Sequence, residues 1–403
     1  MTLSGSLCIR RILPGRPLEA GGTPMSEKKR MANLELLRCV AMMMVIVLHY
    51  LGKGGLLTPL AEKNMSAAGI CAWVLEAFCI VAVNAYMFIS GYFLCESNFK
   101  PSRLIGLWLQ VEFYSVVFGL LGAATGVIAE TTVDTHYYLT LLFPISMEHY
   151  WFLTAYLFLY LLLPLVGAAV RHMSREQLRF ALGTLFAVFC VMKSILPIRL
   201  ETDEKGYDFV WYLVIFLTAA YLRKYGCAFL EKRRNAVILY FGGVFLILLE
   251  AMCLRAVFQK TGSLERMLGV SYEYNHLLPF LAALGLFWIF MSLKIKDGLF
   301  ARIVRRIAPH TLGVYLLHEN LGLRYSWQNL LGADRVTGPV SLILGTALAV
   351  LAVFTAGIII DLLRAALFRA LQTGLRHIKA YRKAEEMLAR ADESFRVSAN
   401  SNP

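Results

Sequence analysis

Charged residues are scarce in this chain. They make up 17% of its 403 residues, whereas 58% are hydrophobic. A soluble globular domain has about a quarter charged residues and about half apolar ones. The chain also has no polar stretch long enough for a separate soluble domain, and apolar runs of about 18 or more residues, each long enough to cross a bilayer, recur along its length. The composition therefore predicts one membrane domain flanked by two tails.

Disulfide and metal-binding signatures are also missing. The eight cysteines show neither a C-x-x-C motif nor Cys/His ligand spacing, and most lie inside apolar runs. We therefore expect reduced packing residues, no metal and no bound cofactor. Residues 1–24 hold arginines but no apolar core, which excludes a signal peptide. Met25 and Met31 are alternative start sites, in which case residues 1–24 are not part of the native protein.

Ten apolar segments are predicted to be transmembrane helices. They lie at residues 34–51, 71–94, 104–128, 150–170, 178–196, 208–224, 235–254, 275–293, 310–328 and 339–361. Lysine and arginine alternate between the connecting segments, by about three to one in favour of the cytoplasmic side when the N-terminus is placed there. The pattern predicts an all-α integral membrane protein with about ten transmembrane helices and both termini cytoplasmic.

This topology divides the chain into three parts. We expect a cytoplasmic tail at residues 1–33, a transmembrane domain at 34–363 and a basic cytoplasmic tail at 364–403. The last of these is helix-favouring and is expected to lie along the anionic inner leaflet. The net charge of +13 follows from the topology, so no nucleic-acid partner is predicted.

The first predicted span carries two costly polar side chains, Arg38 and His49. A charge inside a bilayer is expensive and marks a candidate functional site. Eleven residues at 100° each leave the two side chains about 20° apart, so they share one face and lie about 16 Å apart along the axis. Alternatively, Arg38 reaches the inner headgroups and His49 lies at the outer interface.

Other polar residues fall inside the predicted spans: Glu35, Glu76, Asn84, Ser90, Glu112, Lys193, Glu250, His318 and Glu319. Each of them alone is more typical of a hydrogen bond between helices than of catalysis. Together they indicate a polar interior, which a purely structural bundle would not need.

Four segments, in this order, resemble acyltransferase family 3. The segments are Arg38 with ten residues before His49, NAYMFISGYFL at 84–94, YWFLTAYLFLYLLLPL at 150–165 and TLGVYLLHEN at 311–320. The spacing of the first pair alone is a weak signal, whereas the four segments in order are specific. Proteins of this family are bacterial membrane enzymes that transfer acyl groups from acyl-CoA to extracytoplasmic sugars.

The resemblance implies acyl-CoA as the donor, with its anionic head on the cytoplasmic residues Arg38, Lys100 and Arg103. The family usually has an Arg-x-x-Arg pair where this chain reads Lys100-Pro-Ser-Arg103. Lysine keeps the charge but cannot make a bidentate phosphate contact. The pantetheine arm would then present the thioester to His49, the expected general base for a sugar hydroxyl. Arg38 completes the expected catalytic pair, and an acyl-histidine intermediate is the alternative route.

Acyl transfer also needs a group that stabilises the oxyanion. Asn84, Ser90 and Tyr150 are candidates for that role. Trp151, with Tyr150, is a candidate for stacking against the acceptor sugar, although an aromatic belt at the membrane interface is more typical. His318, which the topology assigns to the cytoplasmic half, either positions acyl-CoA or forms a hydrogen bond between helices.

The prediction is therefore a multi-pass acyltransferase of the cell (cytoplasmic) membrane. It would move an acyl group, most simply acetyl, from acyl-CoA to a hydroxyl of an extracytoplasmic polysaccharide, glycolipid or cell-wall glycan. The acceptor, the bilayer and glycan-assembly proteins are the expected partners. The alternative is a transporter or permease for a glycan or small polar solute, although no helices broken by glycine or proline occur in matching positions of two halves.

Overall fold

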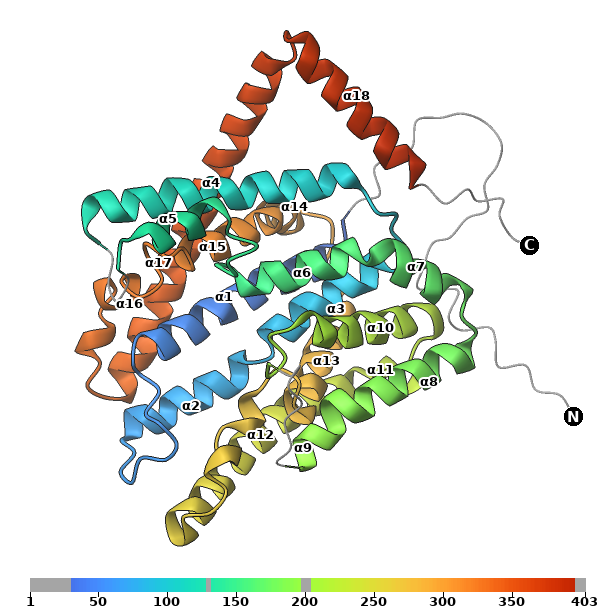
Figure 1. Cartoon of the computed structure of the whole chain (residues 1–403). Coiled ribbons are helices and arrows are strands. Elements are labelled where there is room, and N and C mark those ends of the chain that lie inside the picture. Colours follow the sequence, from blue (N-terminus) through green and yellow to red (C-terminus); the bar gives the residue numbers. More distant parts are fainter. Residues whose placement is uncertain (1–29, 128–131, 197–203, 396–403) are drawn as a thin grey trace, which may run out of the picture. The chain divides into compact units, whose positions relative to one another are not determined.

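The computed structural model describes residues 30–127, 132–196 and 204–395, which are helical and contain no strand. The alternative start site at Met25 and residues 1–24 lie outside the described residues, as does most of the predicted tail 1–33, whereas the alternative start site at Met31 lies within them. From Met31 onward the chain forms one unit (Figure 1).

The α-helices are α1 (Ala32–Lys53), α2 (Ala67–Cys79), α3 (Ala82–Leu94), α4 (Pro101–Thr125), α5 (Thr135–Leu142), α6 (Trp151–Leu161), α7 (Leu163–His172), α8 (Arg175–Phe186), α9 (Lys193–Ile195), α10 (Phe209–Tyr225), α11 (Ala228–Glu231), α12 (Arg233–Thr261), α13 (Leu277–Met291), α14 (Leu299–Ile307), α15 (Thr311–His318), α16 (Trp327–Leu330), α17 (Pro339–Leu375) and α18 (Lys379–Ser394). Shorter segments are the π-helical η2 (Ala187–Met192) and the 3₁₀ turns η3 (Glu265–Met267), η4 (Val270–Tyr272), η5 (Ala308–His310) and η6 (Ala333–Arg335).

Local sequence signals set several helix starts. The side chains of Ser66, Ser174 and Asp208 accept backbone hydrogen bonds at the starts of α2, α8 and α10. Pro101 and Pro339 occupy the first turns of α4 and α17, where a missing N–H costs nothing.

Seven helical segments of the described chain are long and apolar enough to cross a membrane, or eight if the bent pair α6–α7 forms one span. The predicted all-helical membrane architecture is therefore confirmed. The first, third, seventh and tenth predicted spans each correspond to one long helix, namely α1, α4, α12 and α17.

Other predicted spans are interrupted. The second is broken at residues 80–81 between α2 and α3, and the fourth bends by 56° between α6 and α7, where Pro164 follows the break. The prediction of one continuous helix over 310–328 is wrong, because α15 ends at His318. Asn320 accepts a hydrogen bond from the Gly322 N–H at 3.0 Å, an Asx turn that competes with helix continuation.

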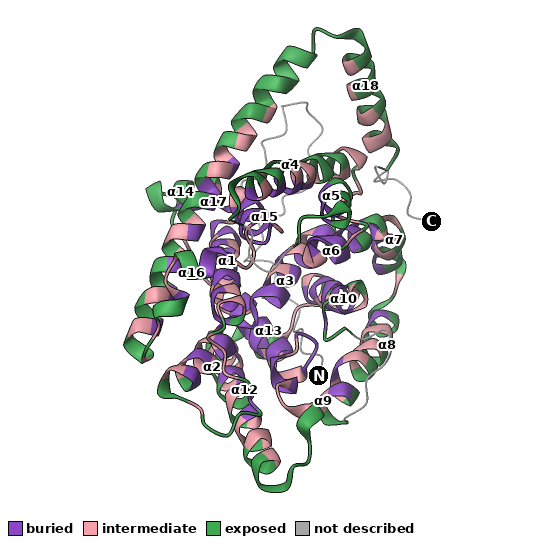
Figure 2. Ribbon diagram, turned by 60° about the vertical axis from the view of Figure 1, so that its left-hand side comes forward, coloured by how far each residue is buried: buried purple, intermediate pink, exposed green. Residues whose placement is uncertain are grey.

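Burial separates inner helices from outer ones. In α1, 61% of the most apolar window is buried, compared with 28% in α17, 22% in α4 and 17% in the segment from α8 to α9. Figure 2 shows the same contrast, with α1 and α15 mostly buried and α4 and α17 largely exposed. Apolar helices with exposed faces are what a bilayer requires, so the outer helices face lipid and α1 is interior.

The short helix α15 is held against α17 by close backbone packing. A side chain at Gly313 would collide with Asp361, and one at Gly357 would come within 2.8 Å of the Val314 backbone. These two positions therefore require glycine, and they fix the depth at which α15 lies.

Asp361, which is fully buried on α17, anchors the start of α15. Its carboxylate accepts hydrogen bonds from Tyr114 at 3.0 Å and from Arg364 at 2.7 Å, and it pairs with the His310 Nδ1 at 2.6 Å. Several charged or polar partners compensate the buried carboxylate, so this end of α15 is rigidly placed.

The chain beyond α17 folds back toward α4. In Figure 1, α17 continues past the other helices and α18 returns at an acute angle. The Asp392 carboxylate accepts a hydrogen bond from the Ser102 N–H at 2.9 Å, and the Phe395 ring lies 4.9 Å from the Phe99 ring, edge to face. The predicted tail from Arg364 onward is thus helical, and its end contacts the start of α4.

Candidate active site

Arg38 and His49 both lie on the uninterrupted helix α1, so the predicted shared face holds. The Arg38 side chain is 27% exposed and forms only a loose pair with Glu35, at 3.9 Å. Its carbonyl oxygen accepts a hydrogen bond from the Tyr86 hydroxyl at 2.8 Å. The guanidinium is therefore available to an anionic ligand.

His49 lies in a cluster that joins α1 to the end of α15. Its Nδ1 is 2.9 Å from the His318 Nε2 and 3.2 Å from the Glu319 Oε1. The Lys53 ammonium, one helical turn after His49, forms an ion pair with the same carboxylate oxygen. The cluster thus contains two imidazoles, one carboxylate and one ammonium group.

The hydrogen bonds assign the tautomers of both imidazoles. The Val314 carbonyl lies 2.6 Å from the His318 Nδ1, so that nitrogen carries a proton and donates it. In the neutral ring the His318 Nε2 is then an acceptor, and the His49 Nδ1–H donates to it and to Glu319. The remaining nitrogen of His49, Nε2, therefore carries a lone pair, on a side chain that is 17% exposed.

Glu319 is almost completely buried, and two cations compensate its charge. Besides Lys53, Arg324 approaches the carboxylate at 4.0 Å and donates to the Glu319 carbonyl at 3.0 Å. Arg324 also donates to the His149 carbonyl at 2.6 Å. This network fixes the carboxylate beside His49, where it can orient the imidazole and stabilise its protonated form.

Sequence reasoning placed Glu319 among the buried polar residues but did not assign it to the site, and it assigned Lys53 to a loop. A carboxylate next to a histidine inside an apolar segment was the available signal for Glu319. For Lys53 the signal was its position four residues after His49 on one helix face.

His149 is a structural neighbour of this cluster. It pairs with the Ser115 hydroxyl at 3.1 Å and accepts a hydrogen bond from the Leu321 N–H at 3.0 Å. Burial and the Arg324 guanidinium lower the pKa of His149 to about 3. His149 is therefore neutral at physiological pH and holds the turn that carries Glu319.

Tyr150 also lies against the turn after α15. Its hydroxyl donates to the Leu316 carbonyl at 3.0 Å and accepts from the Asn320 side chain at 3.1 Å, and its ring stacks on His149 at 3.9 Å. The hydroxyl proton is already used, so in this arrangement Tyr150 positions the turn.

The other oxyanion candidates lie on α3. The Asn84 amide donates to the Tyr274 carbonyl at 2.7 Å and accepts from the Trp211 indole at 3.0 Å, so it bridges α10 and the segment before α13. None of its hydrogen bonds within the described residues reaches His49. Ser90 is half-buried, near the end of the same helix.

Trp151 belongs to an aromatic group in the interior. Its ring lies 4.3 Å from the Tyr207 ring and 5.9 Å from the Tyr274 ring, and it is half-buried. The three rings therefore pack against one another. Tyr207 is partly exposed, so the group is accessible on the side of Tyr207.

Lys100 and Arg103 lie together at the start of α4. The Lys100 backbone N–H donates to the Tyr160 hydroxyl at 3.1 Å, and the Arg103 guanidinium lies 5.4 Å from the centre of the same ring. Arg103 also donates to the Tyr156 hydroxyl at 3.2 Å. Both side chains are exposed, so their charged groups are accessible to a ligand.

His318 does not lie where the topology placed it. It was expected in the cytoplasmic half, away from His49, but its ring centre is 5.1 Å from that of His49. The expectation was wrong because it assumed a continuous helix through residue 328, whereas α15 runs beside α1 and ends at His318.

His49, His318 and Glu319 offer donor atoms within 4.8 Å of one another, a spacing that a metal ion can bridge. Metal binding requires lone pairs, however, whereas here a proton joins the two imidazoles and Lys53 engages the carboxylate. We therefore expect acyl transfer to be unchanged after dialysis against EDTA, measured as product formed per minute. Loss of activity that is restored by one added divalent ion would contradict this assignment.

The fold and the cluster define a class: a helical membrane protein that holds an imidazole by hydrogen bonds in its interior. Over residues 31–361 the chain matches the family model described as an acyltransferase domain, and it belongs to acyltransferase family 3. It is a membrane-embedded acyltransferase, so the resemblance is confirmed. Comparisons with curated proteins and with solved structures give no match.

Proposed function

We propose that this acyltransferase moves an acyl group, most simply acetyl, from cytoplasmic acyl-CoA to a hydroxyl of an extracytoplasmic polysaccharide, glycolipid or cell-wall glycan. In this proposal the chain spans the cytoplasmic membrane about ten times and both termini are cytoplasmic. The observation that carries it is His49, whose Nδ1 is engaged by His318 and Glu319 while its Nε2 keeps a lone pair.

The cluster supports direct transfer with His49 as the base. The His49 Nε2 takes the proton of the acceptor hydroxyl while the hydroxyl oxygen attacks the thioester carbonyl. When the C–S bond breaks, the departing thiolate takes that proton from the imidazolium, so the histidine returns to its neutral form. Glu319 stabilises the imidazolium between the two steps.

An acyl-histidine route would use the same Nε2 as a nucleophile. Rapid quenching of the purified protein with a labelled donor, in the absence of acceptor, distinguishes the two routes. Direct transfer predicts no label on the protein, whereas stoichiometric label on His49 would establish the covalent route.

The positions of Arg38 and His49 near the two ends of α1 support a donor site in which the anionic head and the thioester bind at separate places. Tyr86 contacts the Arg38 carbonyl and the Thr311 hydroxyl, while His318 contacts His49, so α15 runs parallel to α1. The cation and the base therefore lie at opposite ends of the same helix pair. A donor with an anionic head and a remote thioester fits that separation of about 16 Å.

Replacing Arg38 with alanine is expected to raise the KM for acyl-CoA about 10- to 100-fold, since a charge-assisted contact to phosphate is lost. The KM for the acceptor should change less than twofold. Steady-state kinetics with each substrate varied in turn measures both. Arg335→Ala, at an exposed position on η6, is the matched control. An unchanged KM for acyl-CoA in Arg38→Ala would contradict the donor contact and favour the alternative, in which Arg38 contacts the lipid headgroups.

A transferase and a transporter differ in what they do to the thioester. The purified protein in lipid vesicles, supplied with acetyl-CoA and a glycan acceptor, should release free CoA thiol only when the acceptor is present. Thiol release is measured with a disulfide reagent and product by mass spectrometry. Movement of either compound across the vesicle membrane without thiol release would favour the transporter alternative.

A further inference from the structure

Two buried tyrosine hydroxyls lack hydrogen-bond partners among the described residues. They belong to Tyr212 on α10, which is fully buried, and Tyr315 on α15, which is 5% exposed. The Phe152 backbone N–H can only donate to the Tyr315 oxygen, so the hydroxyl proton still has no acceptor among the described residues. An unmade hydrogen bond in an interior is costly and calls for an explanation.

Both hydroxyls lie along a row of rings that connects the two ends of the Arg38–His49 face. The Tyr86 ring, which contacts Arg38, is 6.2 Å from the Phe152 ring. Phe152 is 5.7 Å from Tyr212 and 5.8 Å from Tyr315, measured between ring centres.

The row then reaches the catalytic cluster. Tyr315 is 6.1 Å from His318, which is 5.1 Å from His49. Phe152 and Tyr315 therefore lie between the cationic end and the imidazole end of the site, and Tyr212 packs beside them against Phe152. A ligand that reaches from Arg38 to His49 along this row passes these rings.

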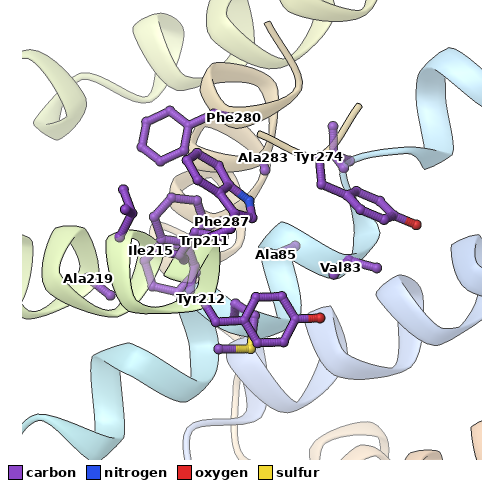
Figure 3. Packing of buried hydrophobic residues seen from close by; sticks show 14 of the residues in the cluster. Val83, Ala85, Trp211, Tyr212, Ile215, Ala219, Tyr274, Phe280, Ala283 and Phe287 are labelled. Atoms are coloured by element: carbon purple, nitrogen blue, oxygen red, sulfur yellow. The ribbon is translucent and has the colours of Figure 1, made fainter. Parts of the chain in front are cut away.

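Figure 3 shows how Tyr212 is presented. Its ring leaves α10 beside apolar side chains, and its hydroxyl points away from Phe280 and Phe287, on the same side as the hydroxyl of Tyr274. The Tyr212 and Tyr315 rings both pack against the Phe152 ring, so the two hydroxyls lie in the same part of the interior.

We propose that the Tyr212 and Tyr315 hydroxyls bind the amide groups of the donor's pantetheine arm. The inference rests on the acyl-CoA donor proposed above. A pantetheine arm carries two amides between its phosphate end and its sulfur, and each amide carbonyl accepts one hydrogen bond. Two unpartnered donors packed against one ring between a cation and a base match that arrangement in number, and the amide carbonyls would supply the acceptors that the two hydroxyls lack among the described residues.

The matched substitutions are Tyr212→Phe and Tyr315→Phe, which remove one oxygen and keep the ring. Each should raise the KM for acetyl-CoA about 5- to 20-fold, with kcat within about twofold of wild type. Thermal stability should not fall in Tyr212→Phe, because no hydrogen bond to the described residues is lost, whereas Tyr315→Phe also loses the contact with the Phe152 N–H. The control is Tyr240→Phe, whose hydroxyl donates to the Phe78 carbonyl at 3.1 Å, and it should lose thermal stability but keep its KM.

Truncated donors locate the contact. S-acetylpantetheine keeps both amides of the arm. S-acetyl-N-acetylcysteamine keeps only one amide, the one nearer the sulfur. With S-acetylpantetheine, both variants should still show a raised KM relative to wild type. With S-acetyl-N-acetylcysteamine, only one of the two variants should show it. A loss of kcat in either variant with every donor would overturn the proposal and assign that hydroxyl to the oxyanion.

Binding without turnover separates this inference from the proposed function. A thioether analogue of acetyl-CoA, titrated calorimetrically into the purified protein, should bind wild type about 5- to 20-fold more tightly than either variant. Equal binding by wild type and both variants would overturn the arm contact while leaving acyl transfer intact. Tight wild-type binding with no transfer to any acceptor would overturn the proposed function alone, and no binding by wild type would overturn both.

Discussion

Replacing His49 with alanine is expected to abolish acyl transfer, with a loss of at least about 10²–10⁴-fold in kcat. The substitution removes the Nε2 lone pair that takes the acceptor proton, and the neighbouring His318 and Glu319 lie on the Nδ1 side of the missing ring, away from the position of Nε2. His318 Nδ1 is bound to a carbonyl, and Glu319 is engaged by Lys53. The measurement is product formation by the purified variant at saturating concentrations of both substrates.

The protein itself should tolerate this change. The Glu319 carboxylate keeps its pairs with Lys53 and Arg324 when the imidazole is absent. Membrane levels should therefore stay near those of wild type, as measured by quantitative immunoblotting. His172→Ala, at an exposed position at the end of α7, is the matched control. Activity retained in His49→Ala at normal membrane levels would remove His49 from the mechanism.

Glu319→Gln is expected to lower kcat by about 10²–10³-fold, with little change in the KM for acyl-CoA. Glutamine keeps a hydrogen-bond acceptor beside the His49 Nδ1 but removes the negative charge that stabilises the imidazolium. Steady-state kinetics over a range of donor concentrations separates the two constants. Wild-type kcat in a folded Glu319→Gln protein would show that the carboxylate only joins the helices.

Folding needs its own control, because Glu319→Gln leaves the half-buried Lys53 without its partner. Removing one member of a fully buried pair costs about 3–5 kcal/mol, and the partial exposure of Lys53 reduces that cost here. The double substitution Lys53→Met with Glu319→Gln removes both charges and should recover thermal stability relative to Glu319→Gln. It should not recover activity, since the imidazolium still lacks its counter-charge. Recovery of both thermal stability and activity would show that the Lys53–Glu319 pair contributes to stability alone.

The helical period predicted the first half of the site. Arg38 and His49 lie on one uninterrupted helix, so their spacing alone placed them on one face. The cost of charge in a bilayer then singled them out. The membrane character was equally predictable, because apolar segments of this length are expected to cross a bilayer.

The second half depended on where a helix ends. The residues after His318 mix polar and apolar side chains, so the apolar content alone did not show that the helix ends before Asn320. The structure ends α15 there by an Asx turn, and that turn brings Glu319 back to His49. A single sequence also does not state which helices are neighbours, so the contact between α1 and α15 came only from the fold.

Buried hydrogen bonds were the least predictable feature. Asn84 and Tyr150 had the right chemistry for an oxyanion, yet the fold uses both to join segments. Tyr212 and Tyr315 look like ordinary core aromatics in the sequence, and only their missing partners distinguish them. Satisfied and unsatisfied polar groups are told apart by neighbours in space, which the residue type does not specify.

Mass spectrometry of surface glycans is the most direct test of transfer by this site. Glycans should be compared from cells with the wild-type gene, with His49→Ala and without the gene. Wild-type glycans should carry a mass increment of one acyl group, and the other two samples should lack it. Identical glycan masses in all three samples, or an increment that persists in His49→Ala, would contradict acyl transfer to a surface glycan by His49.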